Sequence, residues 1–375
     1  MNIVIAPDKF KGSLSAVEVA EAISDGIKKV SKDVAAKIMP IADGGEGTVD
    51  AIAKAAKGKI VYKEVTGPLY KKVSAKMAII YDDTAIIEMS EASGLTLIKE
   101  GEKNPLLTTT YGTGELVLEA INMGCKRIII GIGGSATNDC GAGMAQALGL
   151  RLLDKDGNDI GYGGGELSKV KRIIKSSLWD KISKADVIVA CDVNNPLCGE
   201  NGASYIYGPQ KGATPDMVEF LDQGLSNFAD VIKKDLGKSV KDIPGAGAAG
   251  GLGAGLISFL DGKLVSGIDV VLNAINFEEN IKDADLIITG EGKVDAQSAF
   301  GKALEGVGKI AKKYNIPVIA ITGSIGEGYE GVYKVGIDAV SSIIPHPMDL
   351  EYAMENSYNL IRDAAERAMR IYLLK

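Results

Sequence analysis

Histidine is almost missing from this chain of 375 residues, in which His346 is the single example. Catalytic Ser-His-Asp or Cys-His arrangements would have to run through that one position, and metal sites built from several histidines are excluded. Acid–base chemistry is therefore expected to use carboxylates. The four cysteines, whose spacing matches no metal pattern such as CxxC, are Cys125, Cys140, Cys191 and Cys198. We expect them to be reduced thiols in a reducing compartment.

Long apolar runs and basic stretches are also lacking. No apolar run approaches the roughly 20 residues that a membrane helix needs. The net charge is −7, and the basic residues are scattered, so no positive stripe could follow a nucleic-acid backbone. The first residues, MNIVIAPDKFKGS, indicate a buried strand and a turn rather than a secretory signal. A cytoplasmic protein that binds neither membranes nor nucleic acid is expected, and the sequence is compatible with a homo-oligomer.

Glycine, by contrast, is plentiful, with 47 residues, nearly twice its usual share. Much of it stands in loops, often beside acidic residues, that directly follow short apolar runs. Apolar strands that alternate with helices indicate parallel sheets, and such sheets bind ligands at the carboxyl ends of their strands. The predicted strands cover residues 2–6, 36–41, 127–130, 186–190, 286–289 and 318–321.

The domain organisation follows from an interruption of this series. Three β-rich runs at 59–66, 72–80 and 84–89 are joined by short turns, as antiparallel neighbours are. We therefore predict an α/β fold of two domains with a cleft between them. A discontinuous Rossmann- or flavodoxin-like parallel-sheet domain (1–60 plus 271–375) holds an inserted second α/β domain (61–270).

Further elements can be predicted from helix signals. Ser15 and Glu18 form the pattern of a capping box, and Thr214-Pro215 and Gly237 mark the ends of a helix. The glycine-rich stretch at 245–255 predicts a flexible segment or one that lies against a ligand. One closing helix is expected over 349–372, with an apolar face formed by Leu350, Met354, Ile361, Ala365 and Met369.

Acidic residues follow several of the predicted strands. Carboxylates at strand ends can bind Mg²⁺ or take a proton from an alcohol, and nearby lysines can neutralise phosphate charge. The simpler alternative is that Asp-Gly pairs only form turns. These loops contain Asp8, Lys9 and Lys11; Asp43, Gly44, Gly45 and Glu46; Asp192; and Glu291, Lys293, Asp295, Gln297 and Ser298.

One glycine loop allows a different function. Gly131 to Ala136 reads GxGxxA between a strand and a helix, with Asp154 about 20 residues later, as in a dinucleotide-binding fold. At this glycine content roughly one GxGxxG match is expected by chance. The following hydroxyls and amides fit phosphate at a helix N-terminus, or else helix capping. An NAD(P)-dependent oxidoreductase is therefore the alternative enzyme, and a non-catalytic protein that binds a small acid is the alternative without turnover.

Six longer segments, together with their order, resemble the type-1 glycerate kinase family over essentially the whole chain. They are IAPDKFKGSLSA (5–16), PIADGGEGT (40–48), GIGGSATNDCGAGMAQALG (131–149), ACDVNNPLCGENGAS (190–204), PGAGAAGGLGAGL (244–256) and ITGEGKVDAQSAFGKAL (288–304). The resemblance implies Mg²⁺- and ATP-dependent phosphorylation of D-glycerate, usually to 2-phosphoglycerate, on two α/β domains. Lys9 departs from it, since family members more often carry serine there.

We predict the site residues from these loops and the resemblance together. Lys11 and Lys293 are expected to neutralise phosphate charge. Asp192 and Glu291 are expected to serve as metal ligands or as the catalytic base. The roles of Lys9 and His346 stay open. Substrate or phosphate contacts are expected from Asp8, Asp43, Gly44, Gly45, Glu46, Gly133, Gly134, Ser135, Asn138, Asp295, Gln297 and Ser298.

Overall fold

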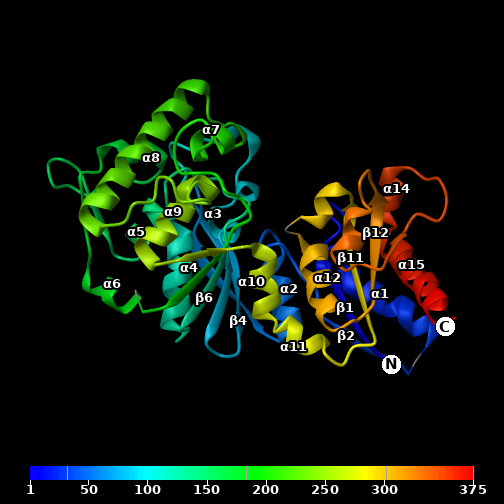
Figure 1. The fold of residues 1–375 in the computed structure, drawn as a ribbon. Helices are drawn as coiled ribbons and strands as arrows, with labels where there is room; N and C mark the ends of the chain where they lie inside the picture. The colour runs from blue at the N-terminus through cyan, green and yellow to red at the C-terminus, as the bar shows by residue number, and fades with distance from the viewer. Residues whose placement is uncertain (32, 183, 301, 375) are drawn as a thin grey trace. The chain divides into compact units, whose positions relative to one another are not determined.

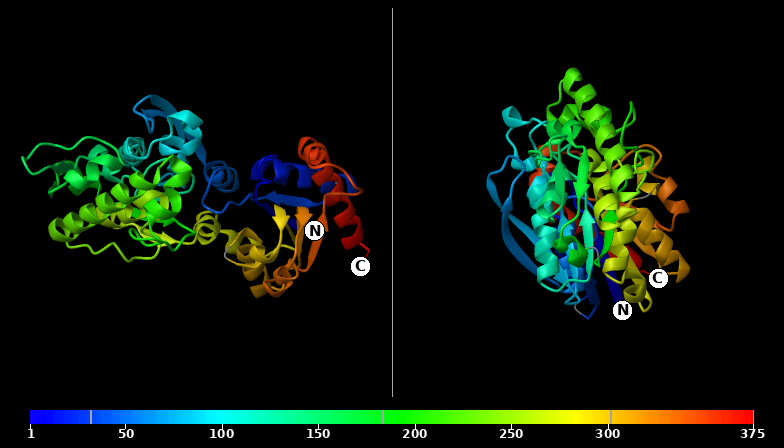
Figure 2. Two further views of the ribbon diagram at one scale, coloured as in Figure 1. Left: turned by 90° about the horizontal axis from the view of Figure 1, so that it is seen from above. Right: turned by 90° about the vertical axis from the view of Figure 1, so that its left-hand side faces the viewer.

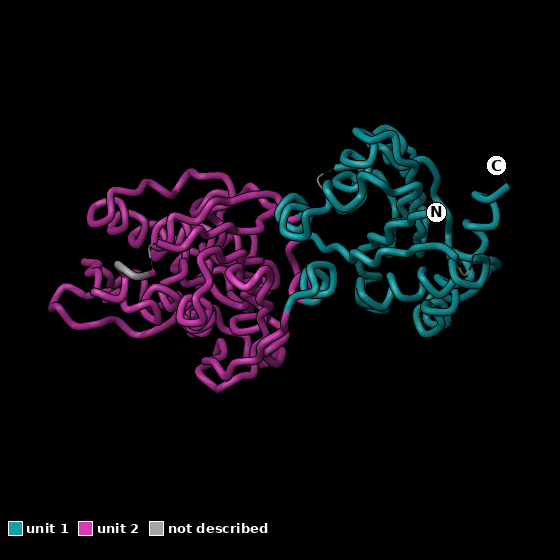
Figure 3. The backbone as a smooth tube through the Cα atoms, turned by 90° about the horizontal axis from the view of Figure 1, so that it is seen from below, with its two compact units in different colours: residues 1–43, 50–58, 268–375 teal, residues 44–49, 59–267 magenta. Residues whose placement is uncertain are grey.

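The computed structural model describes residues 1–31, 33–182, 184–300 and 302–374. Backbone contacts divide the chain into two compact units, which Figure 3 shows in different colours. Unit 1 contains residues 1–43, 50–58 and 268–375, and unit 2 contains residues 44–49 and 59–267. Both units are discontinuous, because the short segment 44–49 belongs with unit 2. That the domains have the predicted bounds, 1–60 plus 271–375 and 61–270, stays a prediction.

Unit 1 is built on a five-stranded sheet in which every pair of neighbours is parallel. Its strands, in spatial order, are β2 (Ala35–Ile38), β1 (Asn2–Pro7), β11 (Leu286–Val294), β12 (Val318–Ile325) and β13 (Ala339–Ser342). Numbered within the unit, this order is 2-1-3-4-5, the flavodoxin-like arrangement. The predicted fold class is confirmed, and so is the prediction that 2–6, 286–289 and 318–321 share one sheet.

Helices cover both faces of this sheet (Figures 1 and 2). Helix α1 (Ala16–Val30) begins at the predicted capping box, in which the Ser15 hydroxyl accepts from the Glu18 N–H and the Glu18 carboxylate accepts from the Ser15 N–H. It packs with α15 on one face over buried Ile3, Ile5 and Ile288. The other helices of this part are α2 (Thr48–Ala56), α10 (Gly267–Ala274), α11 (Phe277–Ile281), α12 (Ala303–Lys313), α13 (Gly331–Lys334), α14 (Leu350–Glu355) and α15 (Ser357–Tyr372).

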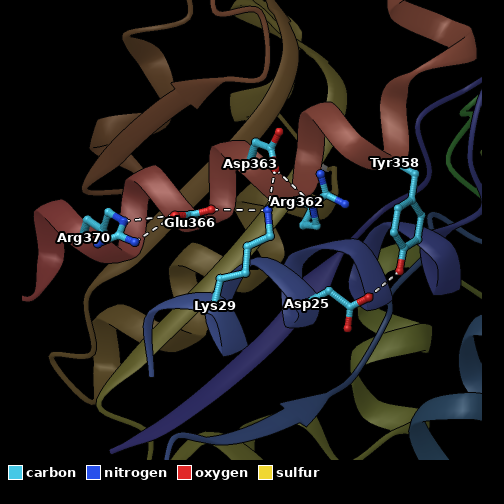
Figure 4. A network of polar contacts seen from close by, with 7 residues as sticks. All are labelled: Asp25, Lys29, Tyr358, Arg362, Asp363, Glu366 and Arg370. Carbon is cyan, nitrogen blue, oxygen red and sulfur yellow. Dashed lines mark hydrogen bonds and ion pairs between the residues drawn. The ribbon is translucent and has the colours of Figure 1, made fainter. Parts of the chain in front are cut away.

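Polar contacts join α1 to α15 at the surface (Figure 4). The Lys29 ammonium lies 2.9 Å from a carboxylate oxygen of Asp363 and 3.4 Å from one of Glu366. The Tyr358 hydroxyl donates to Asp25 over 2.8 Å. Exposed ion pairs of this kind each contribute little, so most of the stability of the helix pair comes from its buried apolar side chains.

The C-terminal helix differs from the prediction. Instead of one helix over 349–372, the chain forms α14 and α15, separated at Asn356, whose backbone (φ −102°, ψ 10°) is not helical. Ile361 and Met369 are buried as expected, whereas Leu350 and Met354 are 75% and 37% exposed. The break turns the first part of the predicted apolar face away from the core.

Strand β11 is longer than predicted. It continues past Thr289 to Val294, because Glu291 and Lys293 pair with Thr322 and Ser324 of β12, which is also extended. Both residues therefore stand on a strand and not in a loop. Since side chains alternate along a strand, Glu291 and Lys293 point to the same face of the sheet.

Unit 2 contains a six-stranded mixed sheet with the order β10 (Lys263–Val265), β9 (Asp186–Ala190), β6 (Arg127–Gly131), β5 (Thr84–Glu88), β4 (Lys72–Ile80) and β3 (Lys59–Thr66). Strands β3, β4 and β5 are antiparallel neighbours, as predicted, and β5, β6, β9 and β10 are parallel. A separate two-stranded sheet pairs β7 (Arg151–Leu153) with β8 (Arg172–Ile174).

The helices of unit 2 are α3 (Ser90–Ser93), α4 (Tyr111–Asn122), α5 (Ala142–Ala147), α6 (Ser177–Ile182), α7 (Ala203–Tyr207), α8 (Pro215–Leu236) and α9 (Ala248–Leu260). Helix α8 begins after Thr214 and ends at Gly237, as predicted. The stretch 245–255 is not a flexible segment, because most of it enters α9, whose Leu252, Ala254 and Leu256 are buried in the core. Within the described residues, no helix has the length and apolar character that crossing a membrane requires.

Candidate active site

A cavity of about 640 Å³ opens at the carboxyl edge of the unit 1 sheet. Its residues come from the carboxyl ends of the strands and the loops after them, from the start of α12, and from α14 and the start of α15. The lining contains charged and apolar side chains together with three serines, Ser13, Ser324 and Ser357. The charged ones are Asp8, Lys9, Lys11, Asp43, Glu291, Lys293, Lys302 and Asp349, and the apolar ones include Phe10, Ile343, Ile344, Met348, Leu350 and Met354.

The sheet order explains why the cavity lies there. Between β1 and β11 the order of strands reverses, and open α/β sheets bind ligands at such a point. Pro7 pairs with Gly290, and the Asp8 N–H then donates to the Gly290 carbonyl over 2.8 Å. Asp8 and Glu291 are thereby held on neighbouring strands at the mouth of this crevice.

Three carboxylates meet in this cavity. Burial, together with the negative charge of Asp43, raises the pKa of Asp8 from 3.8 to about 7, and the charge of Glu291 acts in the same direction. Burial also raises the pKa of Glu291, whereas a hydrogen bond from the Ser298 hydroxyl and the charge of Lys302 oppose that rise. Mutually repelling carboxylates in a partly dry site are suited to a bound cation or to proton transfer.

Lysines also line this cavity. Lys293 is 62% exposed, and its ammonium lies 2.9 Å from Asp295. Lys302 immediately precedes α12 and is within 3.5 Å of the Gln297 side-chain oxygen. The predicted residues Asp8, Lys11, Asp43, Glu291 and Lys293 are therefore brought together. Lys302 was not predicted as a site residue, although it lies within the motif at 288–304.

The residues at 295–298 support the strand that bears Glu291. The Asp295 carboxylate accepts from the Gln297 N–H over 2.9 Å, which starts a short 3₁₀ turn over Ala296–Ala299. The Ser298 hydroxyl turns back to Glu291. In this structure Asp295 and Ser298 orient Glu291 and Lys293, and neither lines the cavity.

In unit 2, Glu88 holds the segment that follows Asp43. This acid ends β5, is 2% exposed, and accepts from the backbone N–H groups of Val49 (2.7 Å) and Gly47 (3.2 Å). Burial raises its pKa to about 7, against the effect of these two hydrogen bonds. Glu88 was not predicted from the sequence, where its only signal is one acid at the end of an apolar run. The predicted residues Gly44, Gly45 and Glu46 lie in the segment that it anchors.

The loop at 133–139 is supported by a buried polar network. Asp139 accepts from Thr110 N–H and Oγ1–H and from the N–H groups of Gly141 and Gly143, and burial raises its pKa despite these bonds. Lys211 is 1% exposed and donates to the Thr137 carbonyl over 2.7 Å. Burial lowers the pKa of Lys211 to about 7. From the sequence, Asp139 could be interpreted either as a phosphate- or metal-binding carboxylate or as a helix cap, and Lys211 was not predicted at all.

Of the residues predicted on this loop, Ser135 and Asn138 are buried, and the Asn138 amide donates to the Ser204 hydroxyl over 3.0 Å. Gly133 and Gly134 are exposed at its turn. The loop is therefore a rigid part of unit 2 with an accessible glycine tip.

The dinucleotide-binding alternative does not fit this geometry. A Cβ on residue 131 would lie 2.4 Å from the Gly44 carbonyl oxygen, so Gly131 makes room for the chain itself and not for a pyrophosphate. Helix α5 begins only at Ala142, well beyond the glycine loop. Asp154 bonds the N–H groups of Asp156 and Asn158 in a turn after β7, which is outside the main sheet.

Asp192 follows β9 in unit 2, is exposed, and accepts from the Gly267 N–H over 2.7 Å. Glu291 belongs to unit 1, so a metal ion shared by these two acids stays a prediction. His346 is exposed, and its ring Nδ1 lies 3.0 Å from the Pro347 carbonyl oxygen. It is absent from the residues that line the cavity.

The cysteines carry no sign of reactivity. All four are free, and burial is the first cause that raises the pKa of each thiol, for Cys198 to about 12. Thiols with a raised pKa hold little thiolate at neutral pH and are poor nucleophiles. Carboxylates and lysines remain the groups able to act on a substrate.

The donor chemistry of the unit 1 cavity fits Mg²⁺. Among the described residues, no group of three or more His, Cys, Asp or Glu side chains is arranged to hold a metal ion alone. Mg²⁺ in phosphoryl-transfer sites usually takes one or two carboxylates and completes its shell with phosphate oxygens and water. Asp8, Asp43 and Glu291 can supply those carboxylates.

The flavodoxin-like sheet and a cavity that combines acids with lysines define an α/β enzyme of the kind that binds a phosphorylated ligand. A family-wide sequence model described as the glycerate kinase family matches residues 3–373. The chain belongs to the glycerate kinase family. It is thus a kinase, which excludes the non-catalytic alternative, and the resemblance predicted from the six motifs is confirmed.

Individual relatives agree. A glycerate kinase of Bacillus subtilis is 52% identical over an aligned region of 377 residues, which covers 100% of this chain and 99% of the relative. A glycerate 2-kinase of Escherichia coli is 52% identical over 362 residues, which are 96% of this chain and 95% of the relative. A crystal structure from Salmonella typhimurium LT2, provisionally named glycerate kinase 2, matches with a TM-score of 0.91 and 48% identity over 100% of this chain and 98% of that one.

Proposed function

We propose that this protein transfers the γ-phosphoryl group of ATP to a hydroxyl of D-glycerate in the presence of Mg²⁺ and releases 2-phosphoglycerate. The observation that carries the proposal is the meeting of Asp8, Glu291 and several lysines in one cavity of a chain in the glycerate kinase family. The name glycerate 2-kinase of the Escherichia coli relative supports the choice of product.

The proposed role of each residue follows from its charge. Lys11, Lys293 and Lys302 neutralise the phosphate chain, which is the main requirement of a loose phosphoryl-transfer transition state. The carboxylates Asp8, Asp43 and Glu291 would hold Mg²⁺, which neutralises phosphate charge when bound. Asp192 and Glu291 carry over from the sequence as candidates for metal binding and for accepting the alcohol proton.

A coupled assay of ADP release tests the proposal. With ATP and Mg²⁺ present, adding D-glycerate should start ADP release, and a chelator should stop it. The ³¹P NMR spectrum of the product separates 2-phosphoglycerate from 3-phosphoglycerate. Glycerate-independent ADP release, or none at all, would refute the proposed reaction, and a 3-phosphoglycerate signal would refute only the position of transfer.

A further inference from the structure

The unit 1 cavity is larger than a three-carbon acid requires. At about 640 Å³ it lies in the range of pockets that enclose whole cofactors or drug-sized ligands. Its charged end, with Lys11, Lys293 and Glu291, occupies only part of the lining. Elsewhere the lining includes an apolar wall formed by Ile344, Met348, Leu350 and Met354, next to the carboxylate of Asp349.

This wall is unusual in being both apolar and accessible. Leu350 is 75% exposed and Met354 is 37% exposed. A single exposed leucine needs no explanation, but four large apolar side chains around one cavity mark a binding surface. Methionines adapt their shape and make favourable contacts with aromatic rings. The wall is therefore suited to a flat, aromatic group.

The two ends of the cavity are fixed to each other. The Ser13 hydroxyl donates to the Met354 carbonyl over 3.0 Å and lies 2.5 Å from the Ser357 hydroxyl. A Cβ on residue 12 would lie 3.1 Å from the Met354 methyl carbon. The loop that bears Lys11 is thus tied to the helix that bears Met354, so one ligand can contact both.

We propose that this cavity is the nucleotide site, with the base against the wall of Ile344, Met348, Leu350 and Met354 and the phosphates at Lys11, Lys293 and Lys302. A nucleoside triphosphate has the required chemistry, an aromatic group at one end and several negative charges at the other. Glycerate has no apolar part to cover this wall. The inference rests on the proposed function, because that function supplies a nucleotide.

Met354→Glu tests the proposal, since it puts a carboxylate on the apolar wall. We expect the Kd of ADP, measured by titration calorimetry without glycerate, to rise at least about tenfold, which is about 1.4 kcal/mol. The KM of ATP should rise similarly, while the KM of glycerate and kcat at saturating ATP change less than about threefold. Tyr352→Glu is the control, because Tyr352 is exposed on the same short helix and is not among the lining residues.

Leu350→Ser gives a second, milder variant in case Met354→Glu does not fold, as judged by its melting temperature. An unchanged ADP affinity in the folded variants would overturn the assignment of the wall, and so would a rise in the KM of glycerate alone. Wild-type protein that binds ADP but phosphorylates no glycerate would refute the proposed function and leave the nucleotide site standing. The two failures are therefore distinguishable.

Discussion

The Glu88 carboxylate and the Val49 N–H form a buried hydrogen bond of 2.7 Å between the end of β5 and the segment after Asp43. The same carboxylate accepts from Gly47, so one acid holds two backbone groups of that segment. Because Asp43 lines the unit 1 cavity and Gly44 to Val49 belong to unit 2, Glu88 fixes the chain where it passes from one unit to the other.

Glu88→Gln should change how stability depends on pH. The folded-state pKa of Glu88 is about 7, above its ordinary 4.5, so the folded protein binds more protons between these values and its unfolding free energy falls as pH rises. The glutamine variant lacks this loss. From pH 4.5 to 7.5 the wild type should lose roughly 2–3 kcal/mol relative to the variant in urea unfolding.

Glu64→Gln is the control for that measurement, because Glu64 lies exposed on β3 of the same sheet. If the unfolding free energies of wild type and Glu88→Gln changed in parallel with pH, the pKa of Glu88 would be the same in the folded and unfolded protein. That result would contradict the prediction.

Lys211→Met should have the opposite effect at higher pH. The pKa of Lys211 is lowered from 10.5 to about 7, so between these values the unfolded chain binds more protons and wild-type stability rises with pH. Relative to the methionine variant, the wild type should gain roughly 3 kcal/mol from pH 7 to 9.5. Lys155→Met, at an exposed site, should leave the profile unchanged, and an equal profile for Lys211→Met would refute a buried neutral amine.

Gly26→Ala should destabilise unit 1. A Cβ on residue 26 would lie 2.1 Å from the Arg362 carbonyl oxygen, so α1 and α15 would have to separate, at a cost of about 1–3 kcal/mol. Gly224→Ala is the matched substitution within α8, where the nearest atom, Leu167 Cβ, is 3.4 Å away. Helix propensity then dominates and should raise stability by up to about 1 kcal/mol. Denaturation midpoints that move in the same direction would contradict this contrast.

Asp192→Asn and Glu291→Gln should each lower kcat at least about a hundredfold, because losing a base or a metal ligand commonly costs about 10²–10⁴. Melting temperatures should stay near that of the wild type. Asp159→Asn serves as control, since Asp159 is exposed and pairs only with Arg151 in the described contacts. Near-normal kcat with a lowered melting temperature would remove the substituted residue from the site.

The sheets were predictable from the sequence, because the apolar composition of runs such as Ile3–Ala6 and Ile128–Ile130 is enough to predict buried strands. Both runs are buried in the structure. The end of β11 was not, since Gly290 to Lys293 lack apolar character and become a strand only by pairing with β12. The acids and lysines of the cavity could be named from their loops. Glu88 and Lys211 could not, because their burial depends on segments far away in sequence, at 47–49 and 137.

The interior position of β1, between β2 and β11, has a consequence for synthesis on the ribosome. Its partner β2 follows within some thirty residues, but its other neighbour, β11, begins only at Leu286. At roughly 5–20 residues per second, the nascent chain waits about 15–55 seconds before the second edge of β1 can pair. Unit 2, encoded almost entirely between these strands, emerges complete during that interval. Until β11 is made, the unpaired edge of β1 is open to wrong pairing with other strands.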